Sequence, residues 1–220
     1  MNIIKGLILK DLLQLKSYKR TLIVYILIFI LTGFAQETTK GIGVMVAVML
    51  TLGFGMFSMA SFNYDEQAKS DGYFLTFPLT KRNILLAKYI LVILSTIVGA
   101  IVGVLASILI IYFIDKQFPN INDILYTILG GIFGVGLIEA IQIPCVYKWG
   151  AEKGRIQMFI VAALIVVLAL GVLSFASDLN ISILANKTEN FIPIVLTLLI
   201  ILIYYISYKV SYKIYKNKEV

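Results

Sequence analysis

The feature that most constrains this chain is a series of long apolar runs with very few charged side chains. Residues 42–62 contain no charged side chain, and similar runs recur along the whole sequence. An α-helix needs about 20 apolar residues to cross the hydrocarbon core of a bilayer. Of the 220 residues, 60% are apolar and 14% are charged, compared with about 25% charged in an ordinary soluble domain. The runs therefore predict a polytopic membrane protein, and they exclude a conventional soluble enzyme and a secreted disulfide scaffold.

The apolar runs predict an all-α fold with six transmembrane helices. We expect these spans at residues 21–35, 42–62, 89–114, 124–143, 156–177 and 191–208. In residues 1–20, apolar side chains recur with a helical period among several lysines, which predicts a helix lying in the membrane interface. The alternative is a cytosolic extension of the first span. The chain, 1–220, is then a single transmembrane domain.

The positions of the basic residues predict the orientation of the chain. Sixteen of the 19 Lys and Arg residues lie before the first span, between the second and third, between the fourth and fifth, or after the sixth. Cytoplasmic loops carry an excess of Lys and Arg. We therefore expect a multi-pass protein with both termini in the cytoplasm. Orientation also accounts for the net charge of +7, and we expect no nucleic-acid partner because the basic residues form no patch with interleaved aromatics.

The residue types exclude several kinds of catalytic site. The chain has no histidine and one cysteine, which leaves no Ser-His-Asp triad, no histidine metal cluster and no intrachain disulfide. It also has no Gly-x-x-x-x-Gly-Lys-Ser/Thr phosphate loop and no soluble stretch long enough for a nucleotide-binding domain. We therefore expect no catalytic residue, no cofactor and no metal site in this chain.

The longest predicted inner loop, residues 63–88, has a composition suited to docking a soluble partner. Thr80 is placed to cap a helix that begins at Lys81 and continues into the third span. The alternative interpretation is a solvated connector between two spans. Three acidic residues of this loop lie on an otherwise basic side of the membrane: Asp65, Glu66 and Asp71.

Three short motifs, in order along the chain, resemble the permease subunits of type-2 ABC exporters. The N-terminal Leu9-Lys10-Asp11-Leu12 resembles the start of such permeases, and residues 144–155 resemble their second inner loop. The first inner loop resembles theirs through Phe62, Tyr64, Asp65, Glu66, Lys69, Pro78, Lys81, Arg82, Lys88 and Tyr89. The resemblance covers the whole chain, with Phe77-Pro78 standing where a Leu-Pro pair is more usual.

The resemblance implies one half of a membrane domain in a prokaryotic plasma membrane. A second copy or a sister permease would complete the translocation path, and a separate cytosolic ABC ATPase would hold ATP and Mg²⁺. Segments 63–88 and 144–156 would be cytoplasmic coupling loops. Within the family, this chain resembles the small six-span branch, which is similar to the exporters of amphipathic peptides such as phenol-soluble modulins. The residues expected to couple to the ATPase are Asp65, Glu66, Lys69, Asp71, Lys81, Arg82, Glu152 and Arg155.

Two further features lie inside the predicted spans. Glu139 and Gln142 lie near the inner end of the fourth span and predict a cavity or gating contact, or else a carboxylate that snorkels to the interface. Pro144 is expected to end or kink this helix. Small residues spaced four apart favour close helix packing within the chain, with a subunit interface as the alternative. They are Ser95, Gly99, Gly103 and Ser107 on the third span and Gly130 and Gly134 on the fourth.

Two other classes of function stay open. An ion- or proton-coupled carrier needs a relay of ionisable residues within the membrane, for which Glu139 is the only deep candidate. A membrane anchor that transports nothing would also use an acidic inner loop to hold a partner. The dependence of transport on ATP and on the ATPase discriminates among the three classes.

Overall fold

The computed structural model is built from helices and describes residues 3–35, 41–70, 79–116, 118–154, 156–157, 159–161, 163–164, 167 and 192–217. No strand occurs in these ranges. In chain order the elements are α1 (Ile3–Leu15), η1 (Lys16–Tyr18), α2 (Lys19–Phe34), α3 (Ile42–Gln67), α5 (Lys81–Asp115), α6 (Ile121–Trp149) and α9 (Ile192–Asn217).

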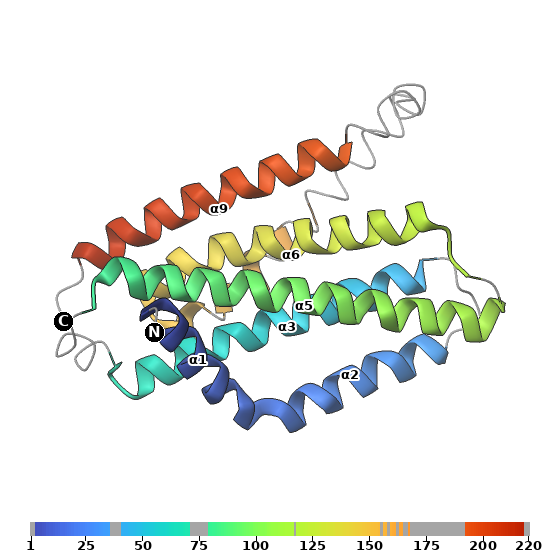
Figure 1. The fold of residues 1–220 in the computed structure, drawn as a ribbon, viewed down its shortest axis with the longest axis horizontal. Helices are drawn as coiled ribbons and strands as arrows, with labels where there is room; N and C mark the ends of the chain where they lie inside the picture. The colour runs from blue at the N-terminus through green and yellow to red at the C-terminus, as the bar shows by residue number, and fades with distance from the viewer. Residues whose placement is uncertain are drawn as a thin grey trace.

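Five helical segments in the described part of the chain are long and apolar enough to cross a membrane: Ile4–Phe34, Ile42–Gln67, Lys81–Asp115, Ile121–Trp149 and Val195–Asn217. They correspond to the predicted first, second, third, fourth and sixth spans. The predicted fifth span, residues 156–177, falls mostly outside the described residues, and six spans stay a prediction. The helix predicted in residues 1–20 is present as α1, which η1 separates from α2 at a visible bend (Figure 1). Its place in the membrane interface stays a prediction.

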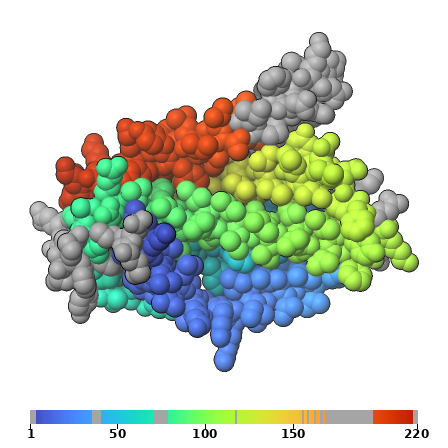
Figure 2. Space-filling model, in the orientation of Figure 1, coloured from blue at the N-terminus to red at the C-terminus, as the bar shows by residue number. Residues whose placement is uncertain are grey.

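The long helices run along the long axis of the molecule (Figure 1). Helices α3 and α5 make the most extensive contact, α6 packs against both and against α9, and α2 packs against α3. In Figure 2, α5 crosses the middle of the visible face with α1 against it, and α2 and α9 lie on either side. The starts of α1 and α5 and the ends of α3, α6 and α9 share one end of the molecule (Figure 1), which we call the inner end.

The close contact between α3 and α5 depends on two glycines of the predicted small-residue row. A Cβ added at Gly99 would lie 2.7 Å from Phe54 Cβ, and one added at Gly103 would lie 2.6 Å from the carbonyl oxygen of Ala47. Both distances are shorter than van der Waals contact, so only glycine lets the two helices approach this closely. By contrast, an added Cβ at Gly130 meets nothing within 4 Å in the described structure. The same holds at Gly134.

The two ends predicted from capping and proline signals have different outcomes. Thr80 caps α5, with its Oγ1 accepting from Asn83 N at 3.3 Å, and the predicted start at Lys81 is confirmed. Of the two outcomes expected for Pro144, an end of the fourth span is wrong, because α6 continues through it to Trp149, and a kink stays a prediction.

A hydrogen bond from α9 explains why α6 continues through its proline. Pro144 has no N–H to donate to the carbonyl oxygen of Ala140, four residues earlier. Ser207 Oγ donates to that carbonyl at 2.5 Å instead. Proline is tolerated in a transmembrane helix where a neighbouring side chain satisfies the freed backbone group.

Candidate functional site

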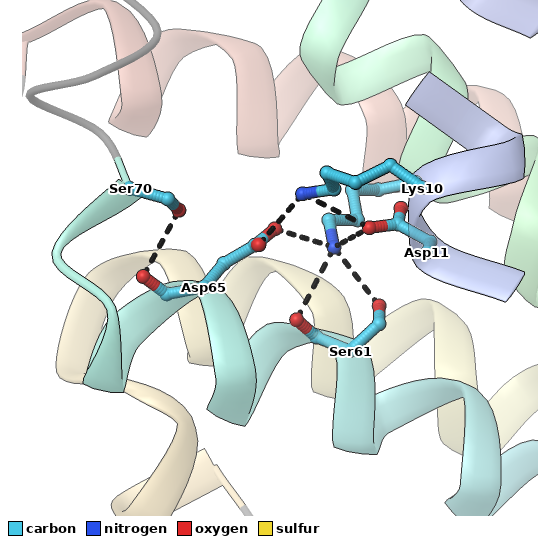
Figure 3. A network of polar contacts seen from close by, with 6 residues as sticks. Lys10, Asp11, Ser61, Asp65 and Ser70 are labelled. Atoms are coloured by element: carbon cyan, nitrogen blue, oxygen red, sulfur yellow. Dashed lines mark hydrogen bonds and ion pairs between the residues drawn. The ribbon is translucent and has the colours of Figure 1, made fainter. Parts of the chain in front are cut away.

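Four charged side chains from three helices form a closed ring at the inner end (Figure 3). Lys10 and Asp11 belong to α1, Asp65 lies near the end of α3, and Lys88 lies in the first turns of α5. Lys10 Nζ lies 3.1 Å from Asp11 Oδ1 and 2.7 Å from Asp65 Oδ1. Lys88 Nζ lies 3.0 Å from Asp11 Oδ1 and 2.6 Å from Asp65 Oδ2. The charges alternate in sign around this charged ring, and their sum is zero.

The charged ring is buried most deeply at Lys88 and Asp11. Their side chains are 4% and 2% exposed, compared with 33% for Lys10. Lys88 Nζ also donates to Ser61 Oγ at 2.9 Å and lies 5.0 Å from the centre of the Phe62 ring. A buried charge is costly unless it is paired and hydrogen-bonded. These partners allow Lys88 to occupy a position on the apolar face of α5.

An apolar cluster next to the charged ring also joins α1 and α5. Leu7 of α1 packs with Ile84 and Ala87 of α5 and with Tyr215 of α9 in one buried cluster. Ile84 comes one turn before Lys88, so the same face of α5 carries this apolar contact and the ammonium group. Because α1 meets α5 through apolar and ionic contacts together, the two helices are expected to move as one body.

Glu66, next to Asp65, connects the two predicted inner loops. Its Oε2 accepts a hydrogen bond from Ala151 N at 2.5 Å, at the start of a helical turn over residues 151–154. A carboxylate is favourable at such a helix start because it satisfies a free N–H group. Gly150 before it has φ +89°, and an added Cβ there would lie 2.6 Å from Glu66 Oε1. The positive φ favours glycine at position 150, and a larger residue there would also displace the Glu66 carboxylate from this contact.

The structure separates the residues predicted to couple to a partner. Asp65 points into the charged ring, with one oxygen on each lysine, and anchors α3. Lys81 Nζ donates to the carbonyl oxygens of Tyr215 and Lys216 at 3.2 and 3.3 Å, near the end of α9. Asp71 and Arg155 lie outside the described residues. Four of the predicted residues are exposed at the inner end: Glu66, Lys69, Arg82 and Glu152.

Glu139 lies in a second polar cluster, inside the bundle. Thr96 Oγ1 of α5 lies 2.6 Å from Glu139 Oε2, and Tyr204 Oη of α9 donates to the same oxygen at 2.8 Å. A Cβ on Gly55 of α3 would overlap Glu139 Oε1. The carboxylate therefore contacts three other helices, and its partners within the described residues are hydroxyl groups rather than a basic side chain.

Gln142, predicted together with Glu139, lies in different surroundings. It forms part of the wall of a cavity of about 240 Å³ between α2, α3 and α6, whereas Glu139 does not. We call this space the inner cavity. Its lining residues are Tyr18, Thr21, Met56, Phe57, Met59, Ala60, Asn63, Gln142, Val146 and Ala151. The contacts of Glu139 suit a fixed link between helices, and the place of Gln142 suits contact with a ligand.

Sequence reasoning missed the pairing of Asp11 with Lys88, although two signals were present. Asp11 is the only acidic residue in the first 20, and Lys88 interrupts a run of apolar residues at the start of the third span. Each is an isolated charge on an apolar helix face, and such charges in folded proteins are paired. Their separation of 77 residues hid the partner.

The comparisons with known proteins agree with the helical membrane architecture. A family model described as ABC-2 family transporter protein matches residues 6–216. The matched range includes the charged ring, Glu66, Glu139 and the inner cavity. No curated protein and no solved structure gives a significant match to this chain.

Proposed function

The chain belongs to the ABC-2 family of transporter proteins, and on this premise we propose that it is the permease half of an ATP-driven exporter. As a multi-pass ABC permease, it would depend on a separate cytosolic ATPase for ATP and Mg²⁺. A second copy or a sister permease would complete the translocation path. The cargo would be an amphipathic peptide or another largely apolar molecule, moved outward from a prokaryotic cytoplasm.

The observation that best supports ATP coupling is the set of polar links at the inner end. The charged ring joins α1, α3 and α5, and Glu66 joins α3 to the second inner loop at Ala151. A partner that docked on the exposed residues of these loops would act on three helices through buried ionic contacts. The exposed positions available to it are Glu66, Lys69, Arg82 and Glu152.

The mechanism would be a rigid-body movement of helices driven by the ATPase. Closure of the ATPase dimer on ATP would displace the inner loops, and the linked helices would follow as a unit. Such a displacement biases the conformational equilibrium only if the ATPase contacts differ between the two states. Opposite charges across the docking surface would guide encounter and fix the register of docking more than they would add affinity.

Reconstitution tests this proposal against its two alternatives. The chain would be placed in vesicles with the candidate ATPase, and transport of a labelled amphipathic peptide would be measured with ATP, without ATP, and with an ATPase unable to hydrolyse ATP. An exporter transports only in the first condition. Transport driven by an ion gradient without ATP would instead indicate a coupled carrier, and ATPase binding without transport would indicate a membrane anchor.

A further inference from the structure

We propose that the inner cavity binds an uncharged, apolar segment of a peptide and recognises a backbone amide of that segment. This proposal depends on the proposed function at one point, because it takes the bound peptide to be the molecule that is exported. The cavity lies within a single chain, at the inner ends of α2, α3 and α6. Binding to it can therefore be measured without the ATPase and without transport.

The size of the inner cavity suits one large apolar side chain together with its amide. An engineered apolar cavity of about 150 Å³ holds a benzene molecule. The inner cavity, at about 240 Å³, has room for an aromatic ring and a few further atoms. Phe57 and Met59 contribute to its apolar wall, and none of its lining residues is charged. A charged group would enter such a cavity only at a high desolvation cost.

The strongest indication of a ligand is the side chain of Gln142. It is 3% exposed and lines the inner cavity. Within the described structure it makes no hydrogen bond, although several polar groups nearby on α6 and α9 are paired. The amide of Gln142 therefore faces the cavity with its hydrogen-bonding groups free to bind a molecule held there in place of water.

The kind of polar group at the wall favours a peptide over a lipid tail. Gln142 and Asn63 both line the inner cavity, and each amide can donate and accept hydrogen bonds. A peptide group offers a matching donor and acceptor, whereas a lipid ester offers acceptors only. Met56 and Met59 complete the wall with flexible, polarizable side chains that adapt to ligands of different shape. The site is therefore suited to apolar peptides of varied sequence.

Binding of the blocked peptide acetyl-Leu-Phe-amide to the purified full chain in detergent tests the proposal. We expect Gln142→Leu to weaken this binding by about fivefold or more, which is the effect of one lost hydrogen bond. The matched control is Gln67→Leu, the same change at an exposed position outside the cavity, which should bind the peptide as the wild type does. Ala60→Phe, which fills the cavity from α3, should abolish binding.

A second readout separates loss of a ligand contact from loss of structure. Without peptide, Gln142→Leu should melt at or above the wild-type temperature, because the amide makes no hydrogen bond within the described residues and leucine packs well against the apolar wall. A clear fall in melting temperature would overturn the assignment, because it would mean that Gln142 supports the fold. Unchanged peptide binding in Gln142→Leu, or equal weakening in Gln67→Leu, would also overturn it.

Two further arms test the class of ligand and the dependence on transport. Phosphatidylcholine in place of the peptide should neither bind with comparable affinity nor displace the peptide; if it does either, the site is a lipid site and the proposal is wrong. Specific peptide binding without ATP-driven transport would contradict the proposed function alone. Transport without binding at this cavity would contradict the present inference alone.

Discussion

Replacing Lys88 by methionine tests whether the charged ring holds the inner end together. Lys88 Nζ contacts Asp11, Asp65 and Ser61 from two other helices, while its side chain is only 4% exposed. Methionine keeps most of the apolar stem and removes the charge. The ring would then carry one net negative charge, and its two carboxylates would share Lys10.

The size of the effect follows from burial. Removing one partner of a buried ion pair costs about 3–5 kcal/mol, because the remaining charge is left uncompensated. For a chain of this length, that loss corresponds to a fall in melting temperature of roughly 6–20 °C. Lys10→Met is the matched control, since it removes the same charge from the ring at a side chain that is 33% exposed. Exposed ion pairs contribute about 0–1 kcal/mol, so we expect a much smaller loss there.

Thermal unfolding of the detergent-solubilised variants is the assay. The double variant Lys88→Met/Asp11→Leu should melt above Lys88→Met alone, because it removes both members of the deepest pair and leaves Lys10 with Asp65. If the free energy of unfolding of Lys88→Met lies within about 1 kcal/mol of the wild-type value, Lys88 does not stabilise the inner end as a buried ion pair. Equal losses for Lys88→Met and Lys10→Met would also refute it.

Two further predictions concern helix packing and the proline of α6. Gly103→Ala brings a Cβ to 2.6 Å from the Ala47 carbonyl oxygen and should cost about 1–3 kcal/mol of stability. Gly130→Ala places its Cβ in open space and should cost nothing. Equal melting temperatures for the two variants would contradict this prediction. Ser207→Ala should cost about 1–3 kcal/mol by leaving the Ala140 carbonyl of α6 unpaired. Pro144→Ala should reduce that loss, because alanine restores an N–H donor for this carbonyl. A double-mutant cycle that shows no coupling between positions 144 and 207 would disprove this explanation.

The outline of this fold follows from local features of the sequence. Apolar length predicts each of the five described spans, because crossing a bilayer requires about 20 apolar residues wherever they occur. The start of α5 follows from Thr80, whose side chain accepts a hydrogen bond from the backbone N–H of Asn83 in the first turn of the helix. Both signals lie entirely within one short segment of chain.

The features that sequence reasoning missed depend on residues far apart in the chain. Continuation of α6 through Pro144 depends on Ser207, which comes 63 residues later in the sequence. The inward direction of Asp65 depends on Lys88 and on α1, while the local pattern indicated only an acidic loop. Partners of this kind become visible only when the helices are packed, so the composition of a loop is a weak guide to which of its charges are exposed.

The number of peptide molecules exported per ATP hydrolysed is the most direct measure of ATP coupling through the inner loops. The measurement compares the wild type with Gly150→Ala, which disturbs the contact of Glu66 with the second inner loop at a position with φ +89°. We expect ATP-dependent export by the wild type, and normal ATPase binding but less peptide moved per ATP by the variant. Export without ATP hydrolysis, or an unchanged ratio in Gly150→Ala, would contradict this expectation.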